Sequence, residues 1–231
     1  MKEIKLEQGS EEWLEYRRGK SGGSLFGKLY KIGGRKNDEY KAYFYSLLAE
    51  RVARPMTPND YMDRMPEGVV FSWAVRGQIL EPEAATAFEK KTGKKLEVCG
   101  VWEGSKDSFV SPDRVIRSKD GKIREAVEIK CLSSEKVLEV WHNRAFSDKS
   151  DFECILNNDY KAQVLKYFMV NKDLELVYWV VYTDLIPNLE LQVLTVSRDE
   201  VEYLLEDAEK VEKLNIAHLK LCEKMLDNAI S

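Results

Sequence analysis

Asp120-Gly121 is flanked by two stretches, Ser111-Pro112-Asp113-Arg114-Val115-Ile116 and Ala126-Val127-Glu128-Ile129-Lys130-Cys131. The second stretch alternates apolar and charged residues, and this period predicts a half-buried strand. Asp-Gly strongly favours a two-residue hairpin turn, because both central residues of that turn need positive φ. The sequence therefore predicts a β-hairpin on which Glu128 and Lys130 project from one face.

The register of this hairpin brings two acids together. With residues 120 and 121 as the turn, the numbers of paired residues add up to 241, as do those of Asp113 and Glu128. Their Cβ atoms are then expected roughly 4.5–5.5 Å apart on one face. Carboxylates this close repel each other unless a cation lies between them, and hard oxygen ligands suit Mg²⁺ or Mn²⁺. A bulge would shift the register, so the prediction applies to a regular hairpin.

Lys130 is expected beside this cation. There its amine would orient or deprotonate the attacking water, or stabilise charge on a phosphate. The three side chains outline a metal-assisted phosphodiester hydrolase. The alternative is an exposed hairpin on which Asp113, Glu128 and Lys130 form a surface salt bridge, since an isolated pattern of this kind is common by chance.

The composition describes one globular domain over residues 1–231. Hydrophobic residues make up 44% and charged residues 33% of the chain. No apolar run approaches the roughly 18 residues of a membrane span, and the N-terminus lacks the apolar core of a signal peptide, so we expect a cytoplasmic protein without membrane contact. The four cysteines form no CxxC pair and there are two histidines, which argues against zinc, iron–sulfur or histidine-based sites.

Charge is distributed unevenly along the chain, whose formal net charge is −4. Residues 16–54 hold ten Lys or Arg and three acids, a net of +7, whereas residues 199–231 hold nine acids and four lysines, a net of −5. A basic N-terminal third suits a phosphate backbone, with an acidic C-terminal helix facing water. Ordinary solvated faces also produce such asymmetry.

A candidate anion site follows the first predicted helix. Ser10 is a suitable N-cap for a helix over 11–18, and Lys20-Ser21-Gly22-Gly23-Ser24 precedes a second helical pattern that reaches Ile32. A Gly/Ser stretch at a helix start offers backbone N–H groups and hydroxyls to an anion, and Arg17 is close in sequence. Simple helix capping is the alternative.

The rest of the pattern predicts an α+β or mixed α/β core. Helical spacing covers 39–54 and 73–93, where Pro82 either kinks the helix or starts a new one, and Glu81 is a surface acid or a third metal ligand. The further expected elements are a loop over 55–70, a strand over 96–102, a helix capped by Asn158 or Asp159 that carries Gln163, strands over 174–183 and 189–196, and a helix from Ser197 to about residue 228.

Together these pieces resemble the YqaJ-type viral recombinase family of the PD-(D/E)XK nuclease superfamily, most closely its lambda-like exonuclease branch. The resemblance spans nearly the whole chain, and it implies a restriction-endonuclease-like core with a central mixed β-sheet flanked by helices. The motifs that carry it are Glu7-Gln8-Gly9 with Trp13, Arg17 and Gly19; Tyr43-Phe44 with Leu47-Leu48-Ala49-Glu50; Gly77 with Glu81; Ser111-Pro112-Asp113; Glu128-Ile129-Lys130-Cys131; and Tyr160-Lys161-Ala162-Gln163-Val164.

The resemblance also implies roles for single residues. Asp113, Glu128, the Ile129 carbonyl and Glu81 would bind the metal. The catalytic set would comprise Lys130, which activates the water, with Glu128, Asp113, Glu81 and the supporting Gln163. Arg17, Ser24 and Ser111 would bind the 5′-phosphate of a DNA end. One departure lies at Lys20-Ser21-Gly22-Gly23, where the family has small Thr/Ala residues, so the geometry of this pocket is left open.

The activity implied by the resemblance is a 5′→3′ exonuclease that uses Mg²⁺, with Mn²⁺ as a substitute and two ions per site. It would degrade one strand of duplex DNA from 5′-phosphorylated ends to mononucleotides and leave 3′ overhangs for a single-strand annealing partner. The family forms rings, which are homotrimers in the lambda-like branch. Two alternatives are an endonuclease of the same superfamily acting in repair or restriction, and a DNA-binding scaffold with a degenerate site.

Overall fold

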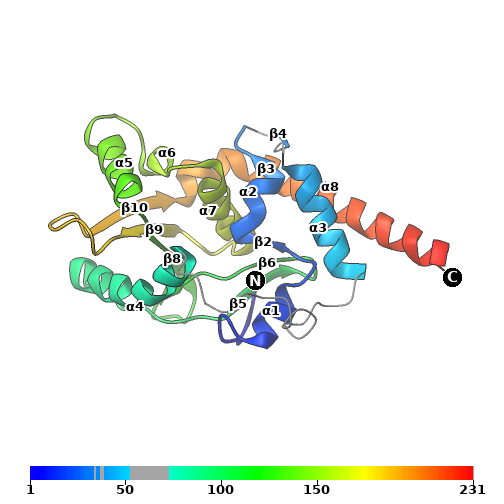
Figure 1. Ribbon diagram of the computed structural model, residues 1–231. Coiled ribbons are helices and arrows are strands. Elements are labelled where there is room, and N and C mark those ends of the chain that lie inside the picture. Colours follow the sequence, from blue (N-terminus) through cyan, green and yellow to red (C-terminus); the bar gives the residue numbers. More distant parts are fainter. Residues whose placement is uncertain (34, 37–38, 53–72, 231) are drawn as a thin grey trace, which may run out of the picture.

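The centre of the fold is a mixed sheet of four strands, β7 (Arg114–Arg117), β8 (Ile123–Cys131), β9 (Leu176–Tyr182) and β10 (Leu191–Ser197) (Figure 1). The computed structural model describes residues 1–33, 35–36, 39–52 and 73–230. The strand order is β10-β9-β8-β7. The pairs β7–β8 and β9–β10 are antiparallel, whereas β8 and β9 are parallel, so the sheet is mixed as predicted.

Helices cover both faces of this sheet. On one face Phe88 packs against Val127 and Ile129 of β8, and on the other face the core includes Ala126 of the same strand. Because both faces are covered, Glu128 is buried, and the alternative of a surface salt bridge on an exposed hairpin is wrong. The covering helices are α4 (Trp73–Thr92) on the first face, and α7 (Asn158–Val170) and α8 (Arg198–Ile230) on the second.

The β7–β8 hairpin differs from the predicted one in two places. Its loop has three residues, 119–121, because Ser118 N–H donates to the Lys122 carbonyl, and in the described residues positive φ occurs here at Gly121 alone. This loop moves the register by one residue. A bulge at Arg124 moves it back, so that Arg114 pairs with Val127 as predicted. The two deviations cancel before the strands reach Asp113 and Glu128.

A second sheet of four strands lies beside the first and holds the N-terminal part of the chain. Its order is β1-β5-β6-β2, with β2 and β6 parallel and the other pairs antiparallel. The predicted strand over 96–102 begins later, since Glu97 makes an isolated bridge to Val115. The strands are β1 (Lys2–Ile4), β5 (Val101–Ser105), β6 (Ser108–Val110) and β2 (Ser21–Gly22).

The second helical pattern is shorter than predicted. It forms the 3₁₀ turn η1 (Gly23–Leu25) and the helix α2 (Phe26–Leu29), after which β3 (Tyr30–Lys31) pairs with β4 (Arg35–Lys36). The Asn158 side chain ends the helix, because it donates to the Gly27 and Tyr30 carbonyls at 3.1 and 2.9 Å and accepts from Ile32 N–H at 2.9 Å. The cap of α7 is accordingly Asn157, and neither Asn158 nor Asp159.

The other predicted helices are present. Ser10 caps the first, Ser197 accepts from Glu200 N–H at the start of α8, and Pro82 lies inside α4 without dividing it. The loop expected over 55–70 lies outside the described residues. The remaining helices are α1 (Glu11–Arg17), α3 (Tyr40–Val52), α5 (Ser134–Ala145) and α6 (Asp151–Cys154).

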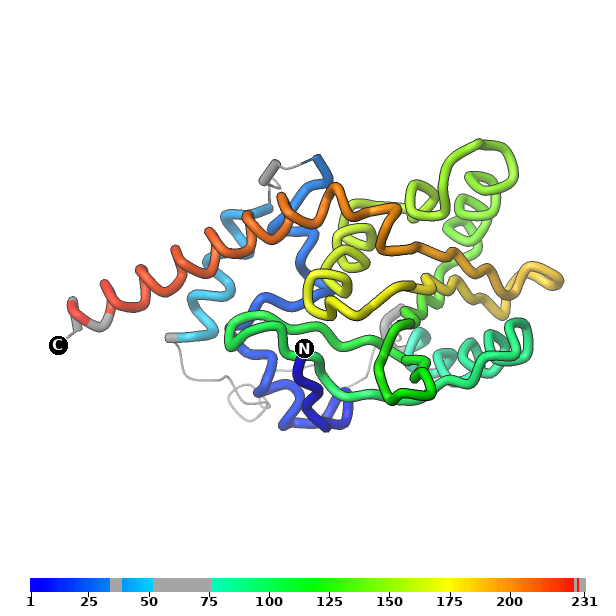
Figure 2. Tube along the Cα trace, turned by 180° about the vertical axis from the view of Figure 1, so that it is seen from behind, coloured from blue at the N-terminus to red at the C-terminus, as the bar shows by residue number. Residues whose placement is uncertain are grey.

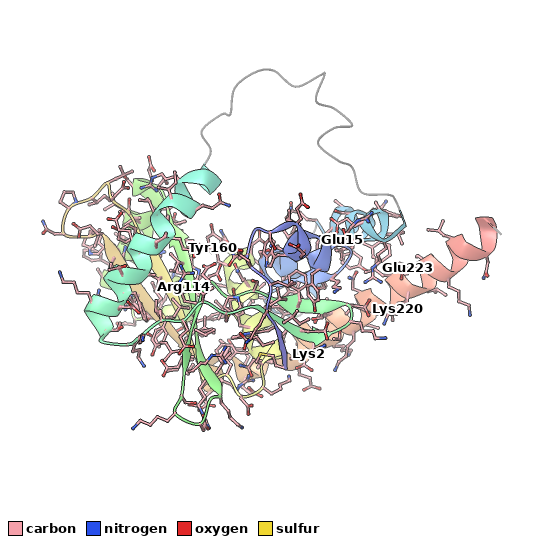
Figure 3. The ribbon with its side chains drawn as sticks, turned by 90° about the horizontal axis from the view of Figure 1, so that it is seen from below. Lys2, Glu15, Arg114, Tyr160, Lys220 and Glu223 are labelled. Carbon is pink, nitrogen blue, oxygen red and sulfur yellow. The ribbon has the colours of Figure 1, made fainter. Side chains whose placement is uncertain are left out.

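The long helix α8 runs past the body of the molecule, and its C-terminal part projects from it in both views (Figures 1 and 2). Lys220 and Glu223 lie where the helix leaves the body (Figure 3). Lys220 pairs with Asp107 at 2.6 Å, and Glu223 pairs with Arg51 of α3 at 3.0 Å, so two ion pairs fix this part of the helix. In the described part of the chain, no helix combines the length and the apolar character that a membrane crossing requires.

Candidate functional site

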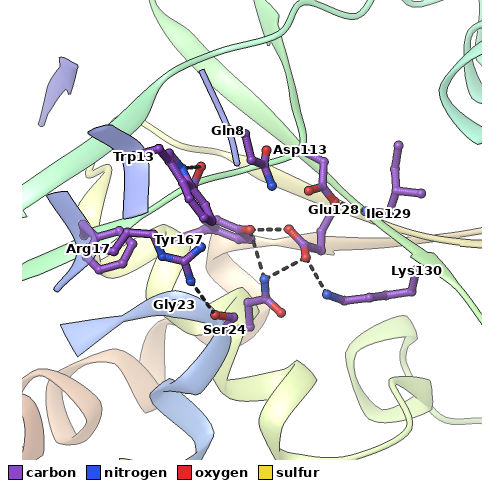
Figure 4. Close-up of a pocket in the computed structure, with 13 residues that line it drawn as sticks. Gln8, Trp13, Arg17, Gly23, Ser24, Asp113, Glu128, Ile129, Lys130 and Tyr167 are labelled. Carbon is purple, nitrogen blue, oxygen red and sulfur yellow. Dashed lines mark hydrogen bonds and ion pairs between the residues drawn. The ribbon is translucent and has the colours of Figure 1, made fainter. Parts of the chain in front are cut away.

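A cavity of about 220 Å³ opens where the two sheets meet (Figure 4). It contains two groups of side chains. The carboxylate half comprises Asp113, Glu128 and Lys130, and the arginine half comprises Arg17, Ser24 and Ser111. The complete lining is Gln8, Trp13, Arg17, Gly23, Ser24, Phe109, Ser111, Asp113, Glu128, Ile129, Lys130, Gln163 and Tyr167.

Asp113 lies one residue before β7 and is 8% exposed. Its Oδ2 accepts from Ile129 N–H at 2.7 Å, which fixes the carboxylate against the edge of β8. Among the described residues no donor contacts its other oxygen. Burial, followed by the negative charge of Glu128, raises the pKa of Asp113 well above its ordinary value. Burial and the charge of Glu128 thus outweigh the positive charge of Lys130 and the hydrogen bond from Ile129 N–H, both of which lower the pKa.

Glu128 is 3% exposed, and the period of two along β8 turns it into the cavity. Its Oε1 accepts from Lys130 Nζ at 2.6 Å and from Gln163 Nε2 at 2.7 Å. Its Oε2 accepts from the Tyr167 hydroxyl. Since Gln163 and Tyr167 are one turn apart on α7, that helix holds the carboxylate in a single orientation.

Lys130 lies on the same face of β8, and its Nζ is 5.2 Å from the centre of the Tyr160 ring. Burial lowers the pKa of its amine, but the negative charges of Glu128 and Asp113 outweigh this effect and raise the pKa above its ordinary value. The side chain is therefore an ammonium group at neutral pH. In that form it donates hydrogen bonds and does not accept a proton.

Glu81 is the predicted site residue that the structure places apart. Its Oε1 accepts from Arg114 Nη1 at 2.6 Å, and Arg114 also contacts the Asp113 carbonyl at 2.5 Å. Glu81 is thus next to the carboxylate half but is absent from the lining of the cavity. Its negative charge still contributes to the raised pKa of Asp113.

The donor set of the carboxylate half fits a hard cation. Asp113 and Glu128 are carboxylates, and Ile129, which lines the same cavity, has a backbone carbonyl as a further oxygen donor. In the described part of the chain, no three His, Cys, Asp or Glu side chains are grouped to hold a metal ion, and the four cysteines are unpaired thiols. Two carboxylates and a carbonyl match Mg²⁺, which keeps several waters in proteins, better than zinc.

The arginine half is assembled from three separate segments. Arg17 Nη2 donates to Ser24 Oγ at 3.4 Å, and the guanidinium carbon lies 3.8 Å from the centre of the Trp13 ring. Trp13 Nε1 in turn donates to Ser111 Oγ at 3.4 Å. A Cβ on Gly23 would lie 2.9 Å from Val110, so a residue without a side chain is needed at this point of the wall. The structure therefore brings together Arg17, Ser24 and Ser111, the residues predicted to bind a phosphate.

Four lining residues were not predicted as parts of the site, namely Gln8, Trp13, Phe109 and Tyr167. Trp13 and Gln8 belong to the N-terminal motif, and the helical spacing of Tyr167 assigned it to the core. Tyr167 is 1% exposed, and burial followed by the charge of Glu128 raises the pKa of its hydroxyl. The signal that was overlooked is its position four residues after Gln163, because a buried tyrosine hydroxyl needs a partner. In Figure 4 it lies between the two halves.

Comparisons with known proteins identify the family and the fold. The sequence profile of the YqaJ-like viral recombinase domain matches residues 12–173. An alkaline exonuclease from Laribacter hongkongensis, LHK-Exo, has a similar structure, with a TM-score of 0.73, 19% identity and coverage of 96% of this chain and 98% of that chain. Its complex with dAMP gives a TM-score of 0.72 at the same identity and coverage.

A phage-related exonuclease from Haemophilus somnus 129PT is more distant, with a TM-score of 0.55, 13% identity and coverage of 87% and 96% of the two chains. No curated protein matches the sequence. The identities are low, so the solved structures establish the fold, which is that of the alkaline exonucleases. The family profile covers more than half of the chain, and the chain belongs to the YqaJ-like viral recombinase family.

Proposed function

We propose that this protein is a Mg²⁺-dependent 5′→3′ exonuclease that degrades one strand of linear double-stranded DNA from 5′-phosphorylated ends to mononucleotides. The observation that carries the proposal is the shared cavity. A half-buried arginine with two serines and a carboxylate pair with a lysine line the same space of about 220 Å³. An enzyme that begins at a phosphorylated end needs both an anion pocket and a hydrolytic centre at this short range.

In this proposal Asp113, Glu128 and the Ile129 carbonyl hold the cation, and Glu81 assists from the neighbouring helix. Bound Mg²⁺ supplies Lewis-acid stabilisation of the negative charge on the scissile phosphate. Mn²⁺ has the same ligand preference and is expected to replace it, and the proposed site takes two ions. The raised pKa of Asp113 supports the assignment, because it marks a carboxylate that gains most from a nearby cation.

The protein groups then carry out the positioning. The Lys130 ammonium orients the attacking water and stabilises charge that develops on the phosphate. Gln163 and Tyr167 keep the Glu128 carboxylate in place through their hydrogen bonds. Arg17, Ser24 and Ser111 would hold the terminal 5′-phosphate, for which the fork of a guanidinium is well suited. The bond that is cut is therefore selected by its distance from the end.

The proposal extends to the assembly. From its family the chain is expected to form a ring-shaped homotrimer that encloses duplex DNA, and to leave a 3′ overhang for a single-strand annealing protein. The molar mass in solution, measured by light scattering, tests the ring, since a monomer would contradict it. Binding of an annealing protein encoded beside this gene, measured by calorimetry, tests the partner.

Cleavage of matched DNA substrates tests the activity. The substrates are a linear 5′-phosphorylated duplex, the same duplex with 5′-hydroxyl ends, and a closed circle of equal sequence, each with Mg²⁺ and with EDTA. Mononucleotide release from the linear phosphorylated form in Mg²⁺ is the expected result, with the circle intact. Nicking of the circle would establish the endonuclease alternative. Absence of cleavage of every substrate, in Mg²⁺ and also when Mn²⁺ replaces it, would establish a non-enzymatic DNA-binding protein.

A further inference from the structure

A lysine of α7 is fully buried behind the arginine half of the cavity. Lys166 has 0% exposure, and its Nζ donates to Ser108 Oγ of β6 at 2.7 Å and to the carboxylate of Glu212 on α8. Glu212 and Ser108 are themselves buried. A buried ion pair of this kind commonly adds no net stability compared with apolar residues of similar size, because both charges lose their hydration. Its position in the fold therefore calls for another explanation.

Lys166 supports both ends of the segment that carries Ser24, one of them through a neighbouring strand. Ahead of η1 it binds Ser108 of β6, which is the register partner of Ser21 in the parallel β2–β6 pair. Behind η1, its Nζ lies 4.9 Å from the centre of the Phe26 ring at the start of α2. One ammonium group thus fixes the chain on either side of the turn.

The wall between Lys166 and the cavity is thin. A Cβ on Gly23 would lie 3.7 Å from Lys166 Cγ, in ordinary van der Waals contact, and 2.9 Å from Val110. Gly23 itself lines the cavity, and β6 continues directly into Ser111 on the opposite wall. Any displacement of Lys166 therefore moves Ser24 and Ser111 relative to Arg17.

We infer that Lys166, held by Glu212, is a positioning residue that sets the geometry of Ser24 and Ser111 and so determines how strongly the enzyme prefers 5′-phosphorylated ends. The inference rests on the proposed function of the arginine half. It assigns a role to α8, because Glu212 links that helix to the pocket. The carboxylate half is attached to α7 through Gln163 and Tyr167, on contacts of its own, so Lys166 acts on end recognition and leaves the hydrolytic group in place.

The test is a double variant, Lys166→Met with Glu212→Leu, which removes both charges and leaves neither one unpaired in the core. The measured quantity is the ratio of kcat/KM on 5′-phosphorylated ends to kcat/KM on 5′-hydroxyl ends. We expect this ratio to fall about tenfold or more, since displacements near 1 Å cost up to about a hundredfold in rate. Turnover of 5′-hydroxyl ends is expected to stay at the wild-type level.

The chain contains a matched control that joins the same two regions. Lys172, just after α7, pairs with Glu209 of α8, but its side chain is exposed. The double variant Lys172→Met with Glu209→Leu should leave the ratio unchanged. If it lowers the ratio as much as the buried pair does, the effect belongs to the attachment of α8 in general and the inference about Lys166 is wrong.

A milder variant covers the case in which the double variant does not fold. Ser108→Ala removes the hydroxyl through which Lys166 holds β6 and keeps the ion pair with Glu212. A reduced ratio supports the inference, and an unchanged ratio overturns it. Equal slowing on both kinds of end would also overturn it, because that is the result of a purely structural defect. If the wild-type protein itself shows no preference for phosphorylated ends, the proposed function of the pocket fails first, and the outcomes are thereby distinguished.

Discussion

The carboxylate half of the cavity lies on the regular ladder of β7 and β8, whereas the arginine half is assembled from the end of α1, the η1 turn and the residue that follows β6. Asp113 and Glu128 are placed by strand pairing, which is stiff and local. Arg17, Ser24 and Ser111 are placed by the packing of segments far apart in the sequence, and a tryptophan links two of them.

The two halves also differ in charge. The carboxylate half holds two buried acids against one lysine, and the arginine half holds a half-buried cation without an acid among its three residues. A cation is needed on one side and an anion on the other, and the end of a nucleic acid with its metal ion supplies both. The comparison predicts that changes in one half alter the chemistry and changes in the other alter the choice of substrate.

Lys130→Ala gives the largest expected effect. Loss of the ammonium group should lower turnover about 10²–10³-fold, as the removal of one preorganised donor does in other enzymes. DNA binding and metal binding should persist, because Asp113 and Glu128 remain. Single-turnover cleavage and isothermal calorimetry measure the two properties. Lys122→Ala, which changes an exposed lysine of the same strand pair, is the control, and equal rates in both variants would remove Lys130 from the site.

Arg17→Ala should act on the other half. We expect cleavage of 5′-phosphorylated ends to slow about 10–100-fold, in line with the strength of hydrogen bonds to charged groups. Ends with a 5′-hydroxyl should be cleaved at the wild-type rate. Arg18→Ala changes the neighbouring arginine, which does not line the cavity, and serves as the control. Equal slowing on both kinds of end would contradict a phosphate pocket.

Tyr167→Phe tests the side chain that lies between the two halves. The hydroxyl donates to Glu128, and its loss should lower turnover about tenfold, the lower end of what loss of a residue that orients a metal ligand costs. The ring stays, so Trp102 keeps its packing partner and the fold is retained. Tyr203→Phe, at an exposed tyrosine of α8, is the control. The prediction fails if only the preference for phosphorylated ends changes.

The smallest expected effect is the change in folding stability that Asp113→Asn produces in the absence of metal. A carboxyl whose pKa is raised by folding contributes stability at low pH that is lost as the pH rises through its folded value. At pH 7 in EDTA the variant should thus be more stable than the wild type by about 0.5–2 kcal/mol, a usual gain for a favourable substitution. The amide can still accept from Ile129 N–H.

Urea unfolding at pH 7 and at a pH well below 3.8, the ordinary pKa of aspartate, measures this difference. It should vanish at the lower pH, where the carboxyl is protonated in both states. Asp148→Asn changes an exposed aspartate and should show no such dependence. Added Mg²⁺ should stabilise the wild type and not the variant. A variant that is less stable than the wild type at both pH values would show that the carboxylate pair is not repulsive.

The same comparison explains what could be predicted from the sequence. Glu128 and Lys130 follow from a period of two, and Asp113 follows from counting along a hairpin, so the carboxylate half was accessible to local reasoning. The count was right although the turn was wrong, because the bulge at Arg124 compensates for the longer loop. The role of Glu81 could not be decided from spacing along α4, which does not reveal its pairing with Arg114.

Local reasoning reached only part of the arginine half. The Gly/Ser stretch that ends at Ser24, with Arg17 close in sequence, predicted an anion site. Nothing in the spacing indicates that Ser111 joins them, and its place there was expected from the family resemblance. Trp13 and Tyr167 have the helical spacing of core residues, and each uses an apolar ring for packing and one polar atom for the site. The helical spacing predicts that the ring is buried, but it does not indicate that the polar atom belongs to the site.

The bulge at Arg124 has a practical consequence. It lies between the hairpin tip and the cavity, and strand pairing beyond it keeps Val127 opposite Arg114 regardless of the loop that precedes it. The tip, Lys119 to Gly121, is surface-exposed and remote from the lining of the cavity. A fluorophore or an affinity tag can therefore be inserted there to follow the protein while it digests its substrate. The strand pairing that places Asp113 near Glu128 should stay unchanged.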